Sequence, residues 1–169
     1  YYLDPNAAYF GSKHGSEPLH VQWNAKTDSV EVVNYSCAMV RDLTVKAVLY
    51  DMNGKQCWEG STRTSIGEDC TQALLPLHFP ADAGPVQLLR LTLTDAEGNL
   101  ISRNDYMRGS DEGNFQALRG MAKAAVNSVF HLVDETSDEL HYTAILTNKS
   151  DAPALMIRLN VVDKGGKQM

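Results

Sequence analysis

Apolar and polar residues alternate along most of the first hundred positions, which is typical of β-strands with one buried face. Leu19, Val21 and Trp23 begin this alternation, and the same period of two recurs in later runs. These runs predict about seven short strands with turns every eight to twelve residues, a spacing typical of an all-β, immunoglobulin-like (Ig-like) sandwich. The expected strands lie at residues 19–24, 30–33 and 43–50, around Trp58, and at 70–79, 86–94 and 100–107.

Turn signals separate these runs. The sequence Asp51-Met52-Asn53-Gly54 predicts a hairpin turn, because both Asn and Gly tolerate positive φ. A second turn is expected at residues 95–99. Pro76 interrupts the run at 70–79, so we expect that strand at the edge of a sheet, where a missing amide donor is tolerated.

Two segments have a helical pattern, residues 5–15 and, more weakly, residues 114–125. Between the expected sandwich and the second of these lies "RGSDEGN", residues 108–114. This stretch is polar, contains glycine and has no hydrophobic period, so it predicts a linker between domains.

The chain past this linker repeats its first half. "VVNYS" and "LTVKAVLYDMNGKQ" align with "ILTNKS" and "LMIRLNVVDKGGKQ", and the loop between the two blocks is shorter by two residues in the second copy. The repeat predicts a second Ig-like sandwich of which residues 115–169 supply only the opening strands. The aligned pairs are Asn34 with Asn148, Ser36 with Ser150, Asp51 with Asp163, Gly54 with Gly166, Lys55 with Lys167, and Gln56 with Gln168.

The charge of the chain limits the kinds of partner that are expected, and the cysteine spacing limits the kinds of metal site. The net charge is −6 and no cluster of Lys and Arg is present, which argues against nucleic acid and anionic membranes as partners. No apolar run approaches the ~20 residues that a membrane span needs. Cys37, Cys57 and Cys70 fit no zinc-binding spacing, so we expect buried free thiols, with one disulfide left open as the alternative.

Candidate catalytic and metal-binding residues are few. Glu17 follows a helical segment and precedes a proline, but no second acid lies at a motif spacing from it. We therefore expect Glu17 to accept hydrogen bonds from backbone amides at the junction with the sandwich. His14 and His20 lack further zinc ligands and are interpreted as surface or junction histidines. The sequence predicts no catalytic residue, no metal site and no cofactor site in this chain.

Two further motifs have a structural interpretation. The acidic run Asp134–Glu139 lacks the spacing of an EF-hand calcium loop and predicts a hairpin turn. Asn34-Tyr35-Ser36 and Asn148-Lys149-Ser150 are glycosylation sequons by pattern.

Exposed aromatic rings would indicate a carbohydrate-binding surface. Trp23, Tyr35, Tyr50 and Trp58 are the candidates, but a sandwich needs several aromatic side chains to fill its interior. We expect them in the core. Trp58 is the best exception, because it lies just beyond a hairpin tip.

The opening segment resembles the end of the catalytic barrel in glycoside hydrolase family 2, in the branch of exo-β-D-glucosaminidases and plant-type endo-β-mannosidases. In those enzymes a D-x-x-x-A-Y-F-G-x-K-x-x-x-E-P-x-H-x-Q pattern leads from the last barrel helix into an Ig-like domain. "VEVVNYS", "VLYDMNGK" and "ISRNDYM" continue the resemblance; the last is similar to the family's S-x-N-x-Y-W, with Met107 at the Trp position. The matching residues of the opening pattern are Asp4, Ala8, Tyr9, Phe10, Gly11, Lys13, Glu17, Pro18, His20 and Gln22.

This resemblance implies a parent enzyme that hydrolyses β-linked glucosamine or mannose residues by the retaining mechanism. Both of the family's catalytic glutamates lie on barrel strands upstream of the opening pattern, so neither is expected in this chain. The expected organisation is a barrel-exit segment (1–18), an Ig-like sandwich (19–107), a linker (108–114) and an incomplete second Ig-like domain (115–169). The expected partner is the parent's own catalytic barrel, with the glycan contacted only indirectly. We expect an extracytoplasmic parent whose export signal lies upstream.

Two alternatives remain: an autonomous carbohydrate-binding module and an Ig-like interaction domain. The second copy also predicts a partner, because its strands have apolar faces without an opposing sheet. We expect a homodimer of the fragment, with a two-fold arrangement that buries the same patch on both chains and is lost when the chain is cut near Gly109. The apolar residues concerned are Val129, Leu140, Tyr142, Leu146, Ile157, Leu159 and Val161.

Overall fold

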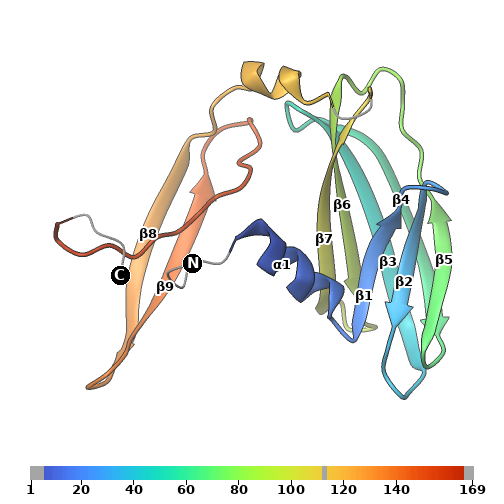
Figure 1. Ribbon diagram of the computed structural model, residues 1–169, viewed down its shortest axis with the longest axis horizontal. Helices are drawn as coiled ribbons and strands as arrows, with labels where there is room; N and C mark the ends of the chain where they lie inside the picture. The colour runs from blue at the N-terminus through green and yellow to red at the C-terminus, as the bar shows by residue number, and fades with distance from the viewer. Residues whose placement is uncertain (1–5, 112–113, 166–169) are drawn as a thin grey trace. The chain divides into compact units, whose positions relative to one another are not determined.

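The computed structural model describes residues 6–111 and 114–165 (Figure 1). The chain divides into two compact units, residues 1–119 and 120–169, and each is described by itself. Asp4 of the opening pattern and Gly166, Lys167 and Gln168 of the repeat lie outside the described residues.

The first unit begins with helix α1, Ala7–Gly15, as residues 5–15 predict. Asn6 caps its N-terminus, where Asn6 Oδ1 accepts a hydrogen bond from the Tyr9 amide at 3.0 Å. Lys13 and His14 lie in the last turn, where positive charge interacts favourably with the helix dipole. The helix ends before Glu17-Pro18, because a residue that precedes proline avoids the helical conformation.

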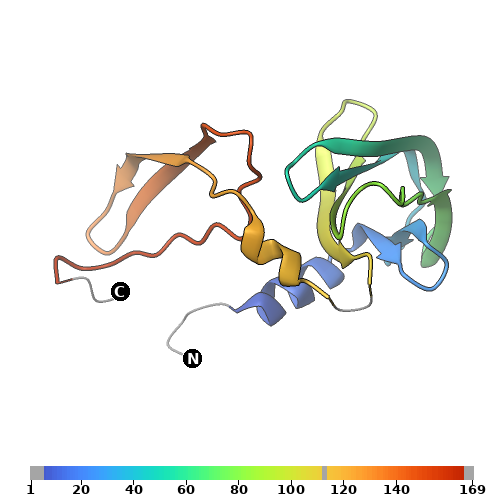
Figure 2. The same cartoon turned by 90° about the horizontal axis from the view of Figure 1, so that it is seen from above.

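An Ig-like β-sandwich follows, and the prediction of about seven strands is confirmed. One sheet has the order β1-β2-β5 and the other the order β4-β3-β6-β7, with antiparallel pairing throughout (Figures 1 and 2). The strands are β1 Leu19–Asn24, β2 Ser29–Asn34, β3 Val40–Asp51, β4 Gln56–Ile66, β5 Cys70–Pro76, β6 Val86–Thr94 and β7 Leu100–Gly109.

The alternating apolar residues form the core between the two sheets. Leu43, Val45, Ala47 and Leu49 on β3 are all fully buried, as the period of two requires. Fully burying a Val or Leu side chain contributes about 1.5–3 kcal/mol, so this cluster is the main source of the stability of the unit. The remaining members of the buried cluster are Val21, Val30, Val32, Ile66, Leu89, Leu91 and Leu93.

Two turns share one construction. In the turn after β3, Gly54 has φ of 85° and the Asp51 amide donates to the Lys55 carbonyl at 2.9 Å. In the turn after β6, Gly98 also has φ of 85°. Only the glycine takes positive φ in the first turn; Asn53 does not, contrary to the expectation for an Asn-Gly hairpin. The turn is closed instead by Asp51 Oδ1, which accepts from the Asn53 and Lys55 amides at 2.8 and 2.9 Å.

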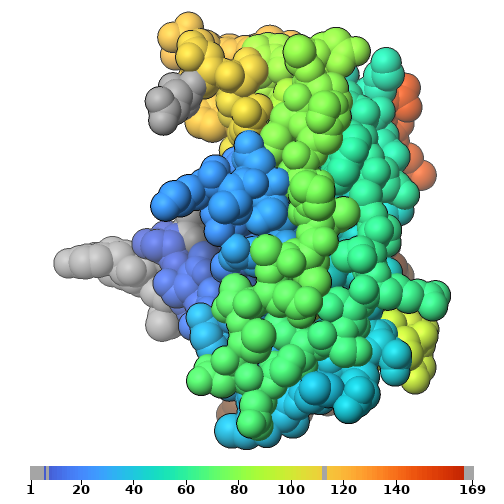
Figure 3. All heavy atoms as spheres, turned by 90° about the vertical axis from the view of Figure 1, so that its right-hand side faces the viewer, coloured from blue at the N-terminus to red at the C-terminus, as the bar shows by residue number. Residues whose placement is uncertain are grey.

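The prediction for Pro76 is confirmed, since β5 is an edge strand and ends at that residue. In the space-filling view, β5 and the segment after it lie on the outside of the sandwich (Figure 3). A proline at a strand end removes no hydrogen bond from the centre of the sheet.

The second unit contains one antiparallel hairpin, β8 (Val126–Glu135) and β9 (Leu140–Asn148). The helical pattern at 114–125 corresponds only to a short 3₁₀-helix, Gln116–Gly120. Residues 154–161 contain no strand, although their alternation predicts one. The expected linker begins inside β7, which continues through Gly109.

Candidate functional site: the junction of the helix and the sandwich

Three side chains on one face of β7 reach the outer edge of β1. The Val21 amide donates to Ser102 Oγ at 3.4 Å, and Asn104 Nδ2 donates to the Val21 carbonyl at 3.3 Å. The Trp23 amide donates to the Tyr106 hydroxyl at 3.2 Å. An edge strand otherwise presents unpaired amides and carbonyls. The side chains of β7 therefore replace a neighbouring strand and close the sandwich along β1. We call these contacts the β1–β7 seam.

The aromatic end of this seam is packed inside the sandwich. The Trp23 ring lies 5.7 Å from Tyr106, edge-on, and 5.8 Å from Phe79. The guanidinium of Arg108 lies 4.3 Å above the Phe79 ring, within the range of a cation–π interaction. Burial raises the pKa of the Tyr106 hydroxyl above its usual value, and the bond from the Trp23 amide only partly opposes this. Trp23 is therefore partly buried and packs against the core cluster, in line with the expectation of core packing.

Glu17 lies at the other end of the seam. Its Oε2 accepts a hydrogen bond from Ser102 Oγ at 2.7 Å, and its Oε1 lies 3.1 Å from His14 Nδ1. Among the residues that the structure describes, the carboxylate of Glu17 thus contacts the side chain of Ser102 on β7 and that of His14 on α1, and the expectation that it accepts from backbone amides is wrong. The difference arises because Ser102, which is only 3% exposed, has a hydroxyl proton that needs an acceptor.

His20 completes the junction. It is 4% exposed, and its Nδ1 lies 3.0 Å from the Glu17 carbonyl, to which it can donate. His14 and His20 therefore contact different atoms of the same residue, Glu17. In the described part of the chain, no group of three or more His, Cys, Asp or Glu residues could hold a metal ion. The arrangement fits a structural junction, and it offers one carboxylate whose oxygens are both occupied.

Among these residues, Ser102 was not singled out from the sequence. Glu17 and Ser102 are 85 positions apart, and no periodicity relates them. A signal was present in "ISRNDYM", where Ser102, Asn104 and Tyr106 occupy alternate positions of one strand. Alternate residues share one face of a strand, so these three polar groups had to meet a common neighbour.

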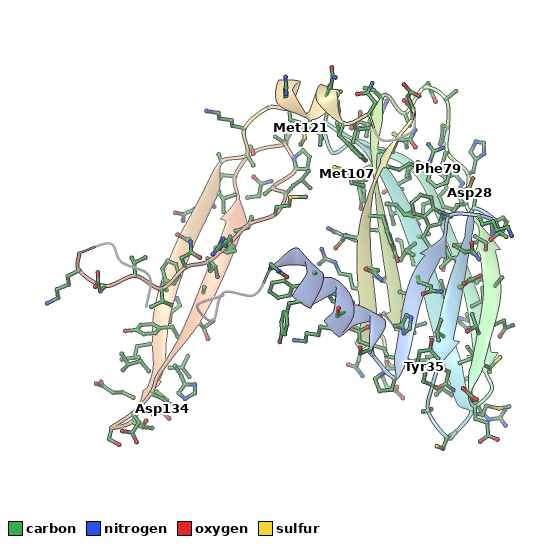
Figure 4. The ribbon with its side chains drawn as sticks, in the orientation of Figure 1. Asp28, Tyr35, Phe79, Met107, Met121 and Asp134 are labelled. Atoms are coloured by element: carbon green, nitrogen blue, oxygen red, sulfur yellow. The ribbon has the colours of Figure 1, made fainter. Side chains whose placement is uncertain are left out.

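The acidic run Asp134–Glu139 forms the tip of the β8–β9 hairpin, as predicted (Figure 4). The Thr136 amide donates to the Glu139 carbonyl at 2.9 Å, and the Glu139 amide donates to Thr136 Oγ1 at 3.0 Å. Glu139 also lies 3.2 Å from His141 Nε2. These local contacts are those of a turn rather than of a cation site.

The aromatic candidates divide into packed and exposed residues. The Trp58 ring lies over Gly60, where an added Cβ would approach Trp58 to 2.6 Å, and it packs against the core cluster. Tyr35 is 62% exposed, which corrects its assignment to the core, and lies at the opposite end of the sandwich from Phe79 (Figure 4). A polar hollow is lined by Asp42, Thr44, Arg63, Thr64, Ser65 and Ala96, a set without an aromatic ring for sugar stacking.

The three cysteines are free thiols in the structure. Cys57 and Cys70 are half-buried, and Cys70 packs against the core cluster. Cys37 is exposed, so the expectation of buried thiols is wrong for this residue. It lies in the irregular segment between β2 and β3, where no facing sheet covers it.

Within residues 6–111 and 114–165, no helix has both the length and the apolar character that crossing a bilayer requires.

A family model and two relatives that match this chain all have the name exo-beta-D-glucosaminidase. Residues 104–169 match the family model described as the exo-beta-D-glucosaminidase Ig-fold domain. The exo-beta-D-glucosaminidase of Hypocrea jecorina is 30% identical over 194 aligned positions, which cover 100% of this chain and 21% of that protein. The Amycolatopsis orientalis exo-beta-D-glucosaminidase is 30% identical over 189 positions, covering 98% of this chain and 18% of that protein.

A solved structure agrees with these sequence matches. The crystal structure of the Amycolatopsis orientalis exo-chitosanase CsxA superposes with a TM-score of 0.86 at 25% identity, covering 99% of this chain and 22% of that one. The chain thus spans about a fifth of the length of these relatives.

Proposed function

The resemblance to the exo-β-D-glucosaminidases of glycoside hydrolase family 2 is confirmed, and from it we propose that this chain is the non-catalytic accessory region of a longer β-glycosidase. The observation that carries the proposal is coverage: nearly all of this chain aligns, with about a fifth of each relative. In this proposal the longer protein hydrolyses β-linked glucosamine or mannose residues, and this region braces its catalytic barrel.

The chemistry of the reaction supports a non-catalytic role. A retaining glycosidase needs two carboxyl groups about 5 Å apart, one as acid and base and the other as nucleophile. Both oxygens of Glu17, the strongest candidate in this chain, already have structural partners in Ser102 and His14. We assign both catalytic glutamates to the barrel of the longer protein.

The second unit is proposed to belong to a second Ig-like sandwich. The family match from residue 104 to residue 169 supports this, because it names an Ig-fold domain and includes both strands of the hairpin. The β8–β9 hairpin also repeats the backbone pairing of the β1–β2 hairpin in the first unit. The Tyr35 amide donates to the Pro18 carbonyl at 2.7 Å, and the Lys149 amide donates to the Ala125 carbonyl at 2.8 Å, just past the ends of the paired strands.

A domain exchange in the Amycolatopsis orientalis exo-chitosanase tests the bracing role. Two variants are needed: one that lacks the region corresponding to this chain, and one in which this chain replaces it. We expect the deletion to lower both the melting temperature and the rate of aryl β-D-glucosaminide hydrolysis, and the replacement to restore part of each. A deletion variant as stable and as active as the intact enzyme would contradict the proposal.

A further inference from the structure

The β1–β7 seam has one partner that does not belong to the sandwich. Ser102 Oγ accepts a hydrogen bond from the Val21 amide and donates its own proton to Glu17 Oε2. Ser102 is 3% exposed, so water cannot easily take the place of the carboxylate. A buried hydroxyl that loses its acceptor destabilises the structure. Glu17 therefore supplies the final hydrogen bond of the seam.

The same carboxylate contacts the helix. Glu17 Oε1 lies 3.1 Å from His14 Nδ1, and the Glu17 amide donates to the His14 carbonyl at 3.2 Å. The Ser16 amide donates to the Ser12 carbonyl at 3.0 Å, which continues the helical bonding up to Glu17. The last turn of α1 and the edge of the sandwich are thus joined through one residue.

Helix α1 has few other means of holding its position. It has nine residues, and those whose burial is described are exposed apart from His14, with Tyr9 at 54% and Phe10 at 50%. Helices of this length are marginal in water unless tertiary contacts stabilise them. The contacts at its C-terminal end consequently decide how firmly α1 is held.

We propose that Glu17 is a positioning residue that fixes the last turn of α1 to the β1–β7 seam through Ser102. The carboxylate is held from both sides, and neither a shorter acid nor an apolar residue would span the two partners. If the proposed function holds, α1 leads out of the catalytic barrel, and Glu17 then sets the angle at which the sandwich meets that barrel. The contact itself lies within this chain and does not depend on that function.

Amide hydrogen exchange in the full chain tests the proposal in the variants Glu17→Ala and Ser102→Ala. We expect each to raise the exchange rates of the Ser16 and Val21 amides about tenfold, relative to the amide of Ala47 in the central strand β3. The double variant should raise these exchange rates little more than either single variant does, since both substitutions remove the same contact. Glu17→Gln keeps an acceptor oxygen and should restore part of the protection.

Glu31→Ala is the matched control. Glu31 also accepts two side-chain hydrogen bonds, from Gln22 Nε2 at 3.0 Å and Asn24 Nδ2 at 2.7 Å, but its bonds do not involve α1. This variant should leave the Ser16 amide unchanged. Unchanged rates in Glu17→Ala, equal acceleration at Ala47, or fully additive effects would each overturn the proposal. None of these outcomes bears on whether the longer protein is a glycosidase, so the two proposals can fail separately.

Discussion

Asn34 and Asn148 make the same hydrogen bonds in two separate units of the chain. Each side-chain oxygen accepts from the amide and the hydroxyl of the serine two residues later, at 3.0 and 2.6 Å in the first unit and 3.1 and 2.8 Å in the second. Each side-chain nitrogen donates to the carbonyl four residues later, at 2.8 and 2.7 Å. The sequence repeat is therefore a repeat of structure at the end of an equivalent hairpin.

The two asparagines differ in their second amide proton. Asn34 is fully buried and donates this proton to the Gly67 carbonyl at 2.7 Å, so both protons of its nitrogen are used. Asn148 is exposed, and within the described residues its nitrogen has the single partner already named. In the fold, Asn34 cannot carry a glycan, and the sequon pattern there reflects the turn.

This difference predicts unequal costs for the same substitution. Asn34→Ala should lower the free energy of unfolding by about 2–4 kcal/mol, because it removes several hydrogen bonds made by a fully buried side chain, including the bond to the Gly67 carbonyl. Asn148→Ala, the matched control, should cost about 1 kcal/mol or less, because water can reach its partners. Denaturant unfolding measures both, and equal losses would contradict the account of the repeat.

Tyr106 predicts how stability depends on alkaline pH. Burial raises the pKa of the Tyr106 hydroxyl in the folded state above its ordinary value of 10.0, so the unfolded chain loses this proton at lower pH. The contribution of the protonated Tyr106 hydroxyl to the free energy of unfolding is fully present below pH ~10. It is lost as the pH rises through the folded-state pKa. Tyr106→Phe should remove this part of the decline, whereas Tyr35→Phe, at an exposed ring, should not. The proposal is wrong if unfolding between pH 9 and 11 gives identical curves for Tyr106→Phe and the unchanged chain.

How far the sequence alone predicts the fold and the candidate site depends on how far apart in the chain the contacting residues lie. The strands and the turns at Gly54 and Gly98 follow from local alternation and turn chemistry, and so they were predictable. The bond from Ser102 to Glu17 joins residues far apart in the chain, and only the folded sandwich brings them together. Residues 154–161 show the limit of the pattern: their alternation favours a strand, but the structure has no strand there, although β8 and β9 each have an edge that no strand of the described chain pairs with.

Carbohydrate binding is the rival function, and calorimetry can decide it. Trp58 packs over Gly60 and against the core, and the polar hollow has no aromatic ring. We therefore expect chito-oligosaccharides and manno-oligosaccharides to bind no more tightly than millimolar, a free energy of about −4 kcal/mol. Tyr35→Ala, at the exposed ring, serves as the comparison for Trp58→Ala. Micromolar affinity that disappears in either variant would favour a binding module.

The exposed hairpin predicts association of the chain. Apolar side chains on β8 and β9 are largely exposed, for example Phe130 at 57% and Tyr142 at 59%. Uncovered apolar faces of this kind favour pairing, and a two-fold arrangement covers the same patch on both chains. Light scattering should show a dimer for the full chain and a monomer for a chain that ends at Arg119. A monomeric full chain with slow amide exchange between Leu140 and Leu146 would mean that the apolar side chains of the hairpin are covered within their own chain. That result would contradict the dimer.

The most direct test of the central claim is the rate at which the purified chain hydrolyses aryl β-D-glucosaminides and β-D-mannosides. A retaining mechanism needs two carboxyl groups in a defined geometry, and the account places both outside this chain. It predicts release of the aryl group at the rate of the buffer alone, both for the unchanged chain and for Glu17→Gln. Turnover above that background, abolished by substitution of a single Asp or Glu, would contradict the claim that this region is non-catalytic.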